Sequence, residues 1–166
     1  MNVLTLMCGI PRCGKSSWIN KNKRDNIIVC PDTIRKEIFG HQFHQPANKF
    51  VFAIAEAMVS LLLKQQKNVI VDATHMTKTL RASWYPVTKE LSYVKTDIVW
   101  VYADKDPQKN LEICIERSRK SVADEIVPYD VLCRMANQFE PPDYTSDYWA
   151  NMIVEHRNPD KSPRTK

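Results

Sequence analysis

Only three glycines occur in this chain of 166 residues, and two of them, Gly9 and Gly14, lie just before Lys15 and Ser16. The segment Gly-Ile-Pro-Arg-Cys-Gly-Lys-Ser fits the pattern G-x-x-x-x-G-K-[ST] at every required position. The apolar run Val3–Met7 precedes it and predicts a buried strand, and the residues after Ser16 predict a helix. This order of strand, loop and helix is typical of loops whose main-chain amides bind phosphate groups.

The pattern also predicts what each position of the loop does. Gly9 lets the chain leave the strand with backbone angles that a side chain would forbid, and Gly14 lets amides come close to phosphates. We expect Lys15 to contact the β- and γ-phosphates of ATP, and the Ser16 hydroxyl to complete the coordination shell of Mg²⁺. The predicted nucleotide-binding residues are Gly9, Ile10, Pro11, Arg12, Cys13, Gly14, Lys15, Ser16 and Ser17.

Length and composition predict one cytoplasmic domain. A chain of 166 residues buries enough surface to form a core without disulfides or metals. No apolar run approaches the roughly 18 residues that a membrane span needs. The five cysteines are odd in number and form no C-x-x-C pair, which indicates free thiols in a reducing compartment. A net charge of +5 is compatible with a nucleic acid partner but is too small to indicate one.

Strand and helix patterns alternate along the chain. This alternation predicts an α/β fold of the P-loop kinase type, with a five-stranded parallel sheet, helices on both faces and a helical lid. The predicted strands are residues 3–7, 26–30, 68–72, 97–102 and 149–154. The predicted helices follow Ser16, Pro31 (to Gly40), Lys49 (to Leu63), Thr77 or Thr79 (to Leu91), Asp106 (to Glu116) and Pro128. Residues 1–155 form the expected domain, and residues 156–166 are expected to be a mobile basic tail.

Polar residues follow the second and third predicted strands, at the edge of the sheet where ligands bind in such folds. Asp32 follows the second strand, and Arg35 lies one helical turn later on the same face. Asp32 is either a helix N-cap or the base that accepts a proton from an attacking hydroxyl. Arg35 either holds an acceptor phosphate or forms a surface ion pair with Glu37 or Glu56. Asp72 ends the third strand, where it can order the magnesium shell or an active-site side chain.

A basic run occupies residues 117–120, at the end of the predicted fifth helix. Part of this charge complements the helix dipole. We expect Arg117, Arg119 or Lys120, in a lid at about residues 117–127, to neutralise charge that develops on a transferred phosphoryl group.

Five segments carry a likeness to a known family: residues 8–18 (C-G-I-P-R-C-G-K-S-S-W), 32–35 (D-T-I-R), 72–74 (D-A-T), 117–119 (R-S-R) and 127–132 (V-P-Y-D-V-L). With these segments, in this order over residues 3–140, the chain resembles the kinase domain of bacteriophage-type polynucleotide 5′-hydroxyl kinases and related small P-loop kinases. Two features depart from that pattern: His75 stands where asparagine is frequent, and the segment after Arg117 is one residue longer.

The resemblance implies an ATP- and Mg²⁺-dependent kinase that phosphorylates the 5′-hydroxyl end of DNA or RNA. It implies that Lys15 and Ser16 bind ATP and the metal, that Asp32 is the general base, and that Arg35 contacts a phosphate of the acceptor. Asp72 and Thr74 would then line the acceptor site, and one lid arginine, Arg117 or Arg119, would stabilise the transition state. Two alternatives stay open: a kinase of a small-molecule hydroxyl (a nucleoside, sugar or antibiotic), and an ATP-binding switch that hydrolyses ATP slowly.

Overall fold

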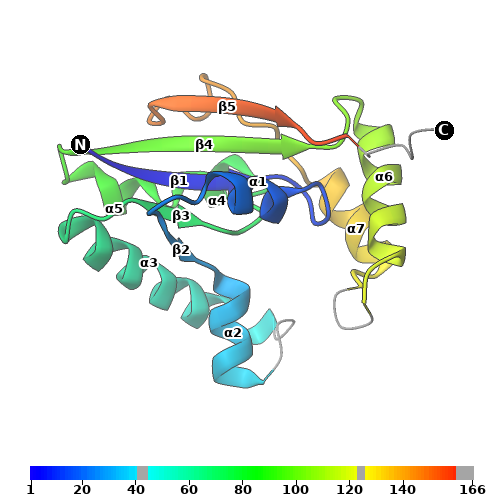
Figure 1. The fold of residues 1–166 in the computed structure, drawn as a ribbon, viewed down its shortest axis with the longest axis horizontal. Helices are drawn as coiled ribbons and strands as arrows, with labels where there is room; N and C mark the ends of the chain where they lie inside the picture. Colours follow the sequence, from blue (N-terminus) through cyan, green and yellow to red (C-terminus); the bar gives the residue numbers. More distant parts are fainter. Residues whose placement is uncertain (41–44, 123–125, 160–166) are drawn as a thin grey trace.

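The computed structural model describes residues 1–40, 45–122 and 126–159 (Figure 1). Part of the polar stretch before the third helix, part of the predicted lid and residues 160–166 of the predicted tail lie outside these residues.

The five strands form one parallel sheet, as the sequence predicts. Their order across the sheet is β2-β3-β1-β4-β5, so the strand that enters the glycine-rich loop is central. In the register, Leu6 pairs with Val71 on one side and with Ile98 on the other. The strands are β1 (Asn2–Cys8), β2 (Ile27–Val29), β3 (Val69–Val71), β4 (Val94–Tyr102) and β5 (Met152–Arg157).

Helices connect the strands and begin or end at recognisable signals. Asp106 caps α6, since its side chain accepts a hydrogen bond from the Lys109 amide at 2.9 Å. Gly40 ends α2 in the left-handed conformation, with φ of 79°. The α-helices are α1 (Lys15–Asn22), α2 (Pro31–Phe39), α3 (Asn48–Lys64), α4 (Lys78–Ala82), α5 (Tyr85–Lys89), α6 (Pro107–Arg119) and α7 (Tyr129–Asn137), and a short 3₁₀ helix, η1 (Gln45–Ala47), precedes α3.

The structure corrects the single helix predicted from residue 77 or 79 to Leu91, which is two short helices, α4 and α5. Thr77 is the cap of α4, and its Oγ1 accepts from the Leu80 amide at 3.2 Å. Pro86 explains the break. A proline has no amide hydrogen and its ring clashes with the carbonyl four residues earlier, and that residue, Ala82, is the last one of α4.

Other boundaries also differ from the prediction, among them those of β5 and α6. β5 begins at Met152 and not at Trp149, because turn hydrogen bonds occupy the preceding residues as far as Ala150. At its other end β5 extends to Arg157, so it includes His156 and Arg157, which the sequence placed in the tail. Helix α6 runs to Arg119, so the basic run forms its last turn and does not follow it.

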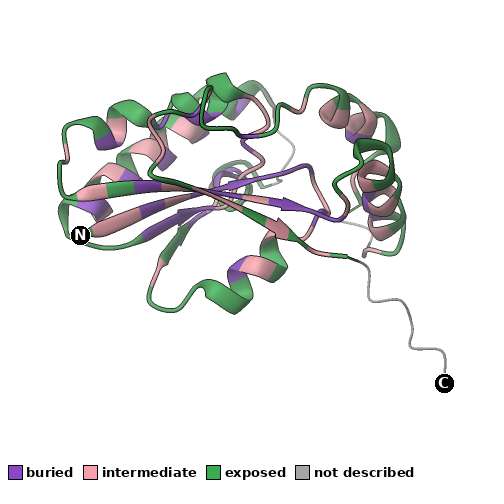
Figure 2. Ribbon diagram, turned by 90° about the horizontal axis from the view of Figure 1, so that it is seen from above, coloured by how far each residue is buried: buried purple, intermediate pink, exposed green. Residues whose placement is uncertain are grey.

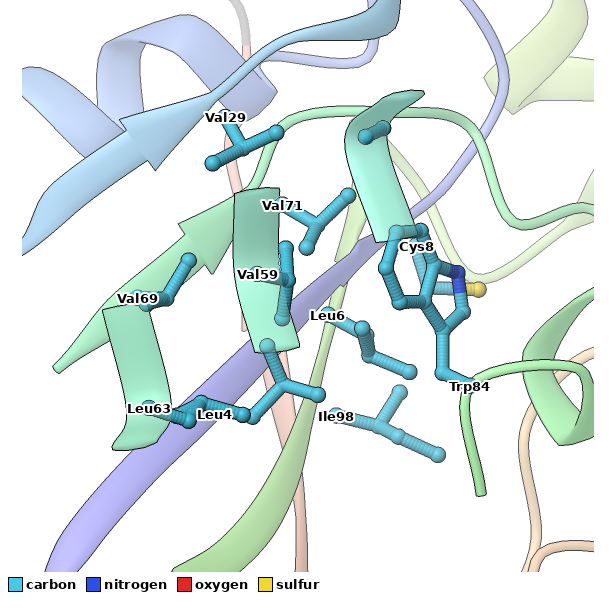
Figure 3. Packing of buried hydrophobic residues seen from close by; sticks show 11 residues of the cluster. Leu4, Leu6, Cys8, Val29, Val59, Leu63, Val69, Val71, Trp84 and Ile98 are labelled. Carbon is cyan, nitrogen blue, oxygen red and sulfur yellow. The ribbon is translucent and has the colours of Figure 1, made fainter. Parts of the chain in front are cut away.

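Side chains of β1 alternate between two apolar layers, one on each face of the sheet. Leu4, Leu6 and Cys8 pack with Ile98 against α3 and Trp84 (Figure 3). On the other face, Met7 packs with Val99 and Val101 against Ile19 of α1 and Cys114 of α6. Figure 2, which shows the sheet from its edge, has helices on both sides, as predicted. No helix within the described residues is long and apolar enough to cross a membrane.

Candidate active site

The loop between β1 and α1 has the backbone geometry that its two glycines allow. Gly9 has φ of 141° and Gly14 has φ of 113°, which side chains rarely adopt. A Cβ atom on Gly9 would lie 2.4 Å from the Val101 carbonyl oxygen, and one on Gly14 would lie 1.9 Å from Asn158 Nδ2. Both glycines are therefore required by backbone angle, and Gly9 is required by space as well, because the nearest atom to its Cβ belongs to the backbone.

The start of α1 offers amide hydrogens to a ligand. Gly14 is the N-cap and has no side chain that could accept from the first turn, so the amides of the first helical residues have no partner within the helix. The helix dipole adds partial positive charge at the same place. Lys15 folds back over the loop, and its ammonium group donates to the carbonyl oxygens of Gly9 at 2.9 Å and Ile10 at 3.0 Å. Ser16 and Ser17 are exposed on the first turn. The loop thus presents a cation, free amides and hydroxyls together, and these fit a nucleotide phosphate and Mg²⁺.

Residues far along the chain hold this loop from its outer side. Arg117 on α6 donates to the carbonyl oxygens of Arg12 at 3.1 Å and Cys13 at 3.3 Å, and to that of Asn158 at 2.7 Å. Asn158 follows β5, and its amide nitrogen donates to the carbonyl oxygen of Tyr102. Arg117 therefore binds the loop itself. Asn158 was not predicted as a site residue, and no sequence signal marks it.

The other basic residues at the end of α6 lie differently. Arg119 is exposed in the last turn of the helix. Lys120 forms an exposed ion pair with Glu116, with 2.7 Å between Nζ and Oε1. Of the three basic candidates, only Arg117 contacts the phosphate loop among the residues described.

The loop cysteine is a buried thiol. Burial raises the pKa of Cys13, although Lys15 and Arg117 oppose the shift. Burial likewise raises the pKa of Cys8, at the end of β1, to about 12. Both side chains are therefore protonated at neutral pH, and they act here as small packing groups.

Asp32 and Arg35 lie one turn apart on α2 and bind each other. Cys30, and not Asp32, is the N-cap of α2, so the N-cap interpretation of Asp32 is wrong. The Arg35 guanidinium donates through Nη1 to Asp32 Oδ1 and through Nη2 to Asn48 Oδ1, the latter at 2.8 Å. The Arg35 side chain is 7% exposed and that of Asp32 is 65% exposed. A buried cation thus holds an accessible carboxylate, and with a side chain only 7% exposed Arg35 does not form the alternative ion pair at the surface.

Asp72 lies close enough to Lys15 and Asp32 for both charges to act on it. Its amide donates to the Val29 carbonyl at 2.9 Å, which places it at the carboxyl end of β3 beside β2. Burial raises the pKa of Asp72, the Lys15 ammonium lowers it, and the Asp32 carboxylate raises it. The ends of β1, β2 and β3 thus bring a lysine and two carboxylates together, as the sequence predicts.

The segment after β3 is fixed against the loop. The Gly9 amide donates to the Thr74 carbonyl oxygen at 3.0 Å. His75 has φ of 39° and is buried, with its ring against Trp84. Its Nδ1 donates to the Met7 carbonyl oxygen at 2.6 Å, since a carbonyl can only accept. Burial lowers the pKa of His75 to about 4, so the imidazole is neutral at pH 7.

A buried ion pair stabilises the segment after β3. The sequence did not predict this pair. Arg81 on α4 and Asp147 before β5 are both fully buried, with 2.9 Å between Nε and Oδ1. Arg81 Nη1 also donates to the carbonyl oxygens of His75 at 3.2 Å and Glu140 at 2.8 Å. Arg81 therefore ties the segment after β3 to the chain that leads into β5.

A cavity of about 310 Å³ opens beside Arg35, between α3 and α4. This volume is at the small end of the range of roughly 300–1,000 Å³ for small-molecule sites. Its walls are mainly apolar and carry a few polar groups. The lining residues are Asn48, Lys49, Phe52, Glu56, Ala73, Thr74, His75, Leu80 and Ser83.

Residues 4–142 match the model of a family described as the AAA domain. The match extends over most of the chain. The chain belongs to this family. Its fold is that of the P-loop kinases. No curated protein matches the chain.

Three solved structures illustrate the fold. A chain of the Pnkp1/Rnl/Hen1 RNA repair complex matches with a TM-score of 0.65 and 23% identity, over 82% of this chain and 43% of that one. A fungal RNA kinase matches with a TM-score of 0.68 and 12% identity, over 98% and 77%. A gluconokinase from Sinorhizobium meliloti 1021 matches with a TM-score of 0.54 and 13% identity, over 93% and 83%. This chain spans less than half the length of the first of these chains.

Proposed function

We propose that this protein transfers the γ-phosphate of ATP to the 5′-hydroxyl end of a nucleic acid. One observation carries the proposal: an accessible carboxylate, Asp32, is bonded to a buried guanidinium, Arg35, which also binds Asn48 in the wall of the cavity. A nucleotide-binding switch has no need of a base and a second anion-binding group on the acceptor side of its phosphate loop. A kinase that accepts a phosphorylated alcohol needs both.

Each group has a defined part in the transfer. The amides of the first turn of α1 and the Lys15 ammonium bind the phosphates of ATP. Mg²⁺, when bound, neutralises charge on the phosphate oxygens, and the Ser16 hydroxyl and the Asp72 carboxyl are the groups that would hold it. Asp32 accepts the proton of the acceptor hydroxyl as that oxygen bonds to the γ-phosphorus and ADP leaves.

The acceptor side is built to bind a second phosphate. The guanidinium of Arg35 is the kind of group that binds phosphate oxygens, and its hydrogen bond to Asn48 fixes its orientation. Thr74 lines the cavity next to it. In a nucleic acid end, the phosphate on the 3′ side of the terminal nucleoside is the group that would meet Arg35. The proposed lid residue that stabilises the transition state is Arg119 or Arg117, and Arg117 is already bonded to the loop.

A second candidate is a kinase of a small alcohol, which the modest volume of the cavity favours. The two candidates differ in whether the acceptor must carry a phosphate. A nucleoside 3′-monophosphate and the same nucleoside without phosphate have the same hydroxyl, so this pair isolates the contribution of the phosphate.

The test is a phosphotransfer assay with labelled ATP and Mg²⁺. The acceptors are 5′-hydroxyl DNA and RNA oligonucleotides, nucleoside 3′-monophosphates, bare nucleosides and a panel of sugars. The proposal predicts transfer to the oligonucleotides and the 3′-monophosphates and poor transfer to bare nucleosides. Equal or better transfer to bare nucleosides or sugars would assign the protein to the small-molecule kinases.

A further inference from the structure

Helix α3 forms one wall of the cavity, and the chemical type of the side chains in this wall changes along the helix. Asn48, Phe52 and Glu56 all line the cavity, and they are four residues apart. Such residues lie on one face of a helix, and each step of four rises about 6 Å along its axis. The Asn48 amide, which binds Arg35, therefore lies at one end of this wall, and the Phe52 ring follows. Glu56 lies about 12 Å further along the helix axis than Asn48.

The facing wall comes from α4 and is mainly apolar. Leu80 lines the cavity with much of its side chain exposed. Ser83 also lines it, but the Ser83 hydroxyl donates to the Leu80 carbonyl oxygen at 2.9 Å. A flat group that enters between Phe52 and Leu80 therefore meets apolar surface on both sides, which is what a nucleobase needs for stacking.

Glu56 is the unexplained group of this cavity. It is partly buried, and it forms no hydrogen bond or ion pair with any residue that the structure describes. A carboxylate accepts hydrogen bonds and cannot donate them when ionised. It repels phosphate, so a phosphorylated acceptor is oriented with its phosphate at the Arg35 end and its base toward Glu56.

We propose that Glu56 selects the terminal base of the acceptor and favours guanine; this inference rests on the proposed function. The Watson–Crick edge of guanine presents two adjacent N–H donors, from N1 and N2, which one carboxylate can accept together. Uracil and thymine present a single N–H between two carbonyl oxygens, which the carboxylate repels. Adenine and cytosine present one amino group each and rank between the two extremes.

The test compares kcat/KM for the four ribonucleoside 3′-monophosphates. These acceptors share the hydroxyl and the phosphate and differ only in the base. The wild type is expected to prefer guanosine over uridine 3′-monophosphate by about tenfold or more, the size of one bidentate contact. In Glu56→Gln, whose side-chain amide both donates and accepts, the preference falls to within about threefold, because transfer to the guanosine acceptor falls and transfer to the uridine acceptor does not.

A matched control and two contrary outcomes complete the test. Glu90→Gln makes the same chemical change at an exposed position that does not line the cavity, and it should keep the preference of the wild type. Equal kcat/KM for all four acceptors in the wild type, or an unchanged guanine preference in Glu56→Gln, overturns the role of Glu56 and leaves the proposed function standing. Failure of the wild type to phosphorylate any 3′-monophosphate or oligonucleotide overturns both.

Discussion

The Nη2 of Arg35 lies 2.8 Å from the Oδ1 of Asn48, so a buried guanidinium on α2 is bonded to the first residue of α3. The same guanidinium holds Asp32. Asp32 and Arg35 were recognisable from their spacing, but Asn48 shows how the pair is held. The proposed base and the proposed phosphate-binding group are parts of one bonded unit that includes Asn48 in the wall of the cavity.

Lys15→Ala should nearly abolish phosphotransfer and leave the fold intact. The substitution removes the ammonium group that is proposed to contact the β- and γ-phosphates. The fold should persist because the Lys15 side chain is not part of the hydrophobic core. Turnover at saturating ATP and Mg²⁺ is the measurement, and Lys21→Ala, an exposed lysine in the last turn of α1, is the control. Unchanged turnover in Lys15→Ala would exclude the assigned role of the loop.

Asp32→Asn should lower kcat by roughly 100-fold or more and leave ATP affinity nearly unchanged, since asparagine cannot take up the proton. Little stability should be lost, because Cys30 is the N-cap of α2, Asp32 is exposed, and the asparagine oxygen can still accept the hydrogen bond from Arg35. Single-turnover kinetics and a urea unfolding curve measure the two effects. A variant that is destabilised but has wild-type kcat would show that Asp32 is structural.

Arg35→Lys should raise KM for nucleoside 3′-monophosphates and oligonucleotides by about tenfold, because lysine keeps the charge but loses the planar pair of donors. KM for ATP should stay unchanged. Added salt should also weaken acceptor binding by the wild type. Lys36→Ala, at the neighbouring exposed position, is the control. If KM for ATP rises and KM for the acceptor does not, Arg35 belongs to the nucleotide side.

Asp147→Asn should lower the free energy of unfolding by about 3–5 kcal/mol, because it leaves the fully buried Arg81 cation without its partner. Glu116→Gln, which breaks the exposed ion pair between Glu116 and Lys120, should lower the free energy of unfolding by less than about 1 kcal/mol. Urea unfolding curves of the two variants give the comparison. Equal, small losses would mean that the buried pair contributes little.

Acid should destabilise the protein partly through His75. Burial lowers its folded-state pKa from 6.5 to about 4, so the unfolded chain binds the proton more tightly. The contribution of the neutral His75 imidazole to the free energy of unfolding is fully present above pH 6.5. It is lost as the pH drops from 6.5 toward 4, and the total loss is about 3 kcal/mol.

The measurement for His75 is the free energy of unfolding between pH 7 and pH 4. His75→Asn keeps a polar side chain without a titration in this range, so its stability should fall less steeply over the same interval. Parallel pH profiles for the wild type and the variant would contradict a buried, neutral His75.

The sheet was predictable because its signals are local. Apolar runs bounded by polar residues gave four strands within a few residues, and the loop pattern fixed which strand enters the phosphate site. The errors have local causes as well. Pro86 divides the helix after β3, and turn hydrogen bonds delay β5 to Met152.

The supporting contacts of the site could not be read from the sequence. Arg81 and Asp147 are 66 positions apart, and each looks like an ordinary surface residue in its own segment. Asn48, Phe52 and Glu56 do carry a signal, their spacing of four on a helix, but it acquires meaning only when α4 is known to face them. Local sequence patterns predict helices and strands. They do not predict contacts between residues that are distant in the sequence and that only the folded topology brings together.

The contact between Asn158 and the phosphate loop has a consequence for how the molecule folds. Asn158 and Cys13 are 145 positions apart, and Asn158 reaches the loop only when β5 has paired with β4. Contacts of such long range carry a large loop-closure cost and tend to form late. The phosphate loop thus depends on a residue 145 positions later, and a growing polypeptide should acquire its affinity for ATP only after Asn158 has been synthesised and β5 has paired with β4.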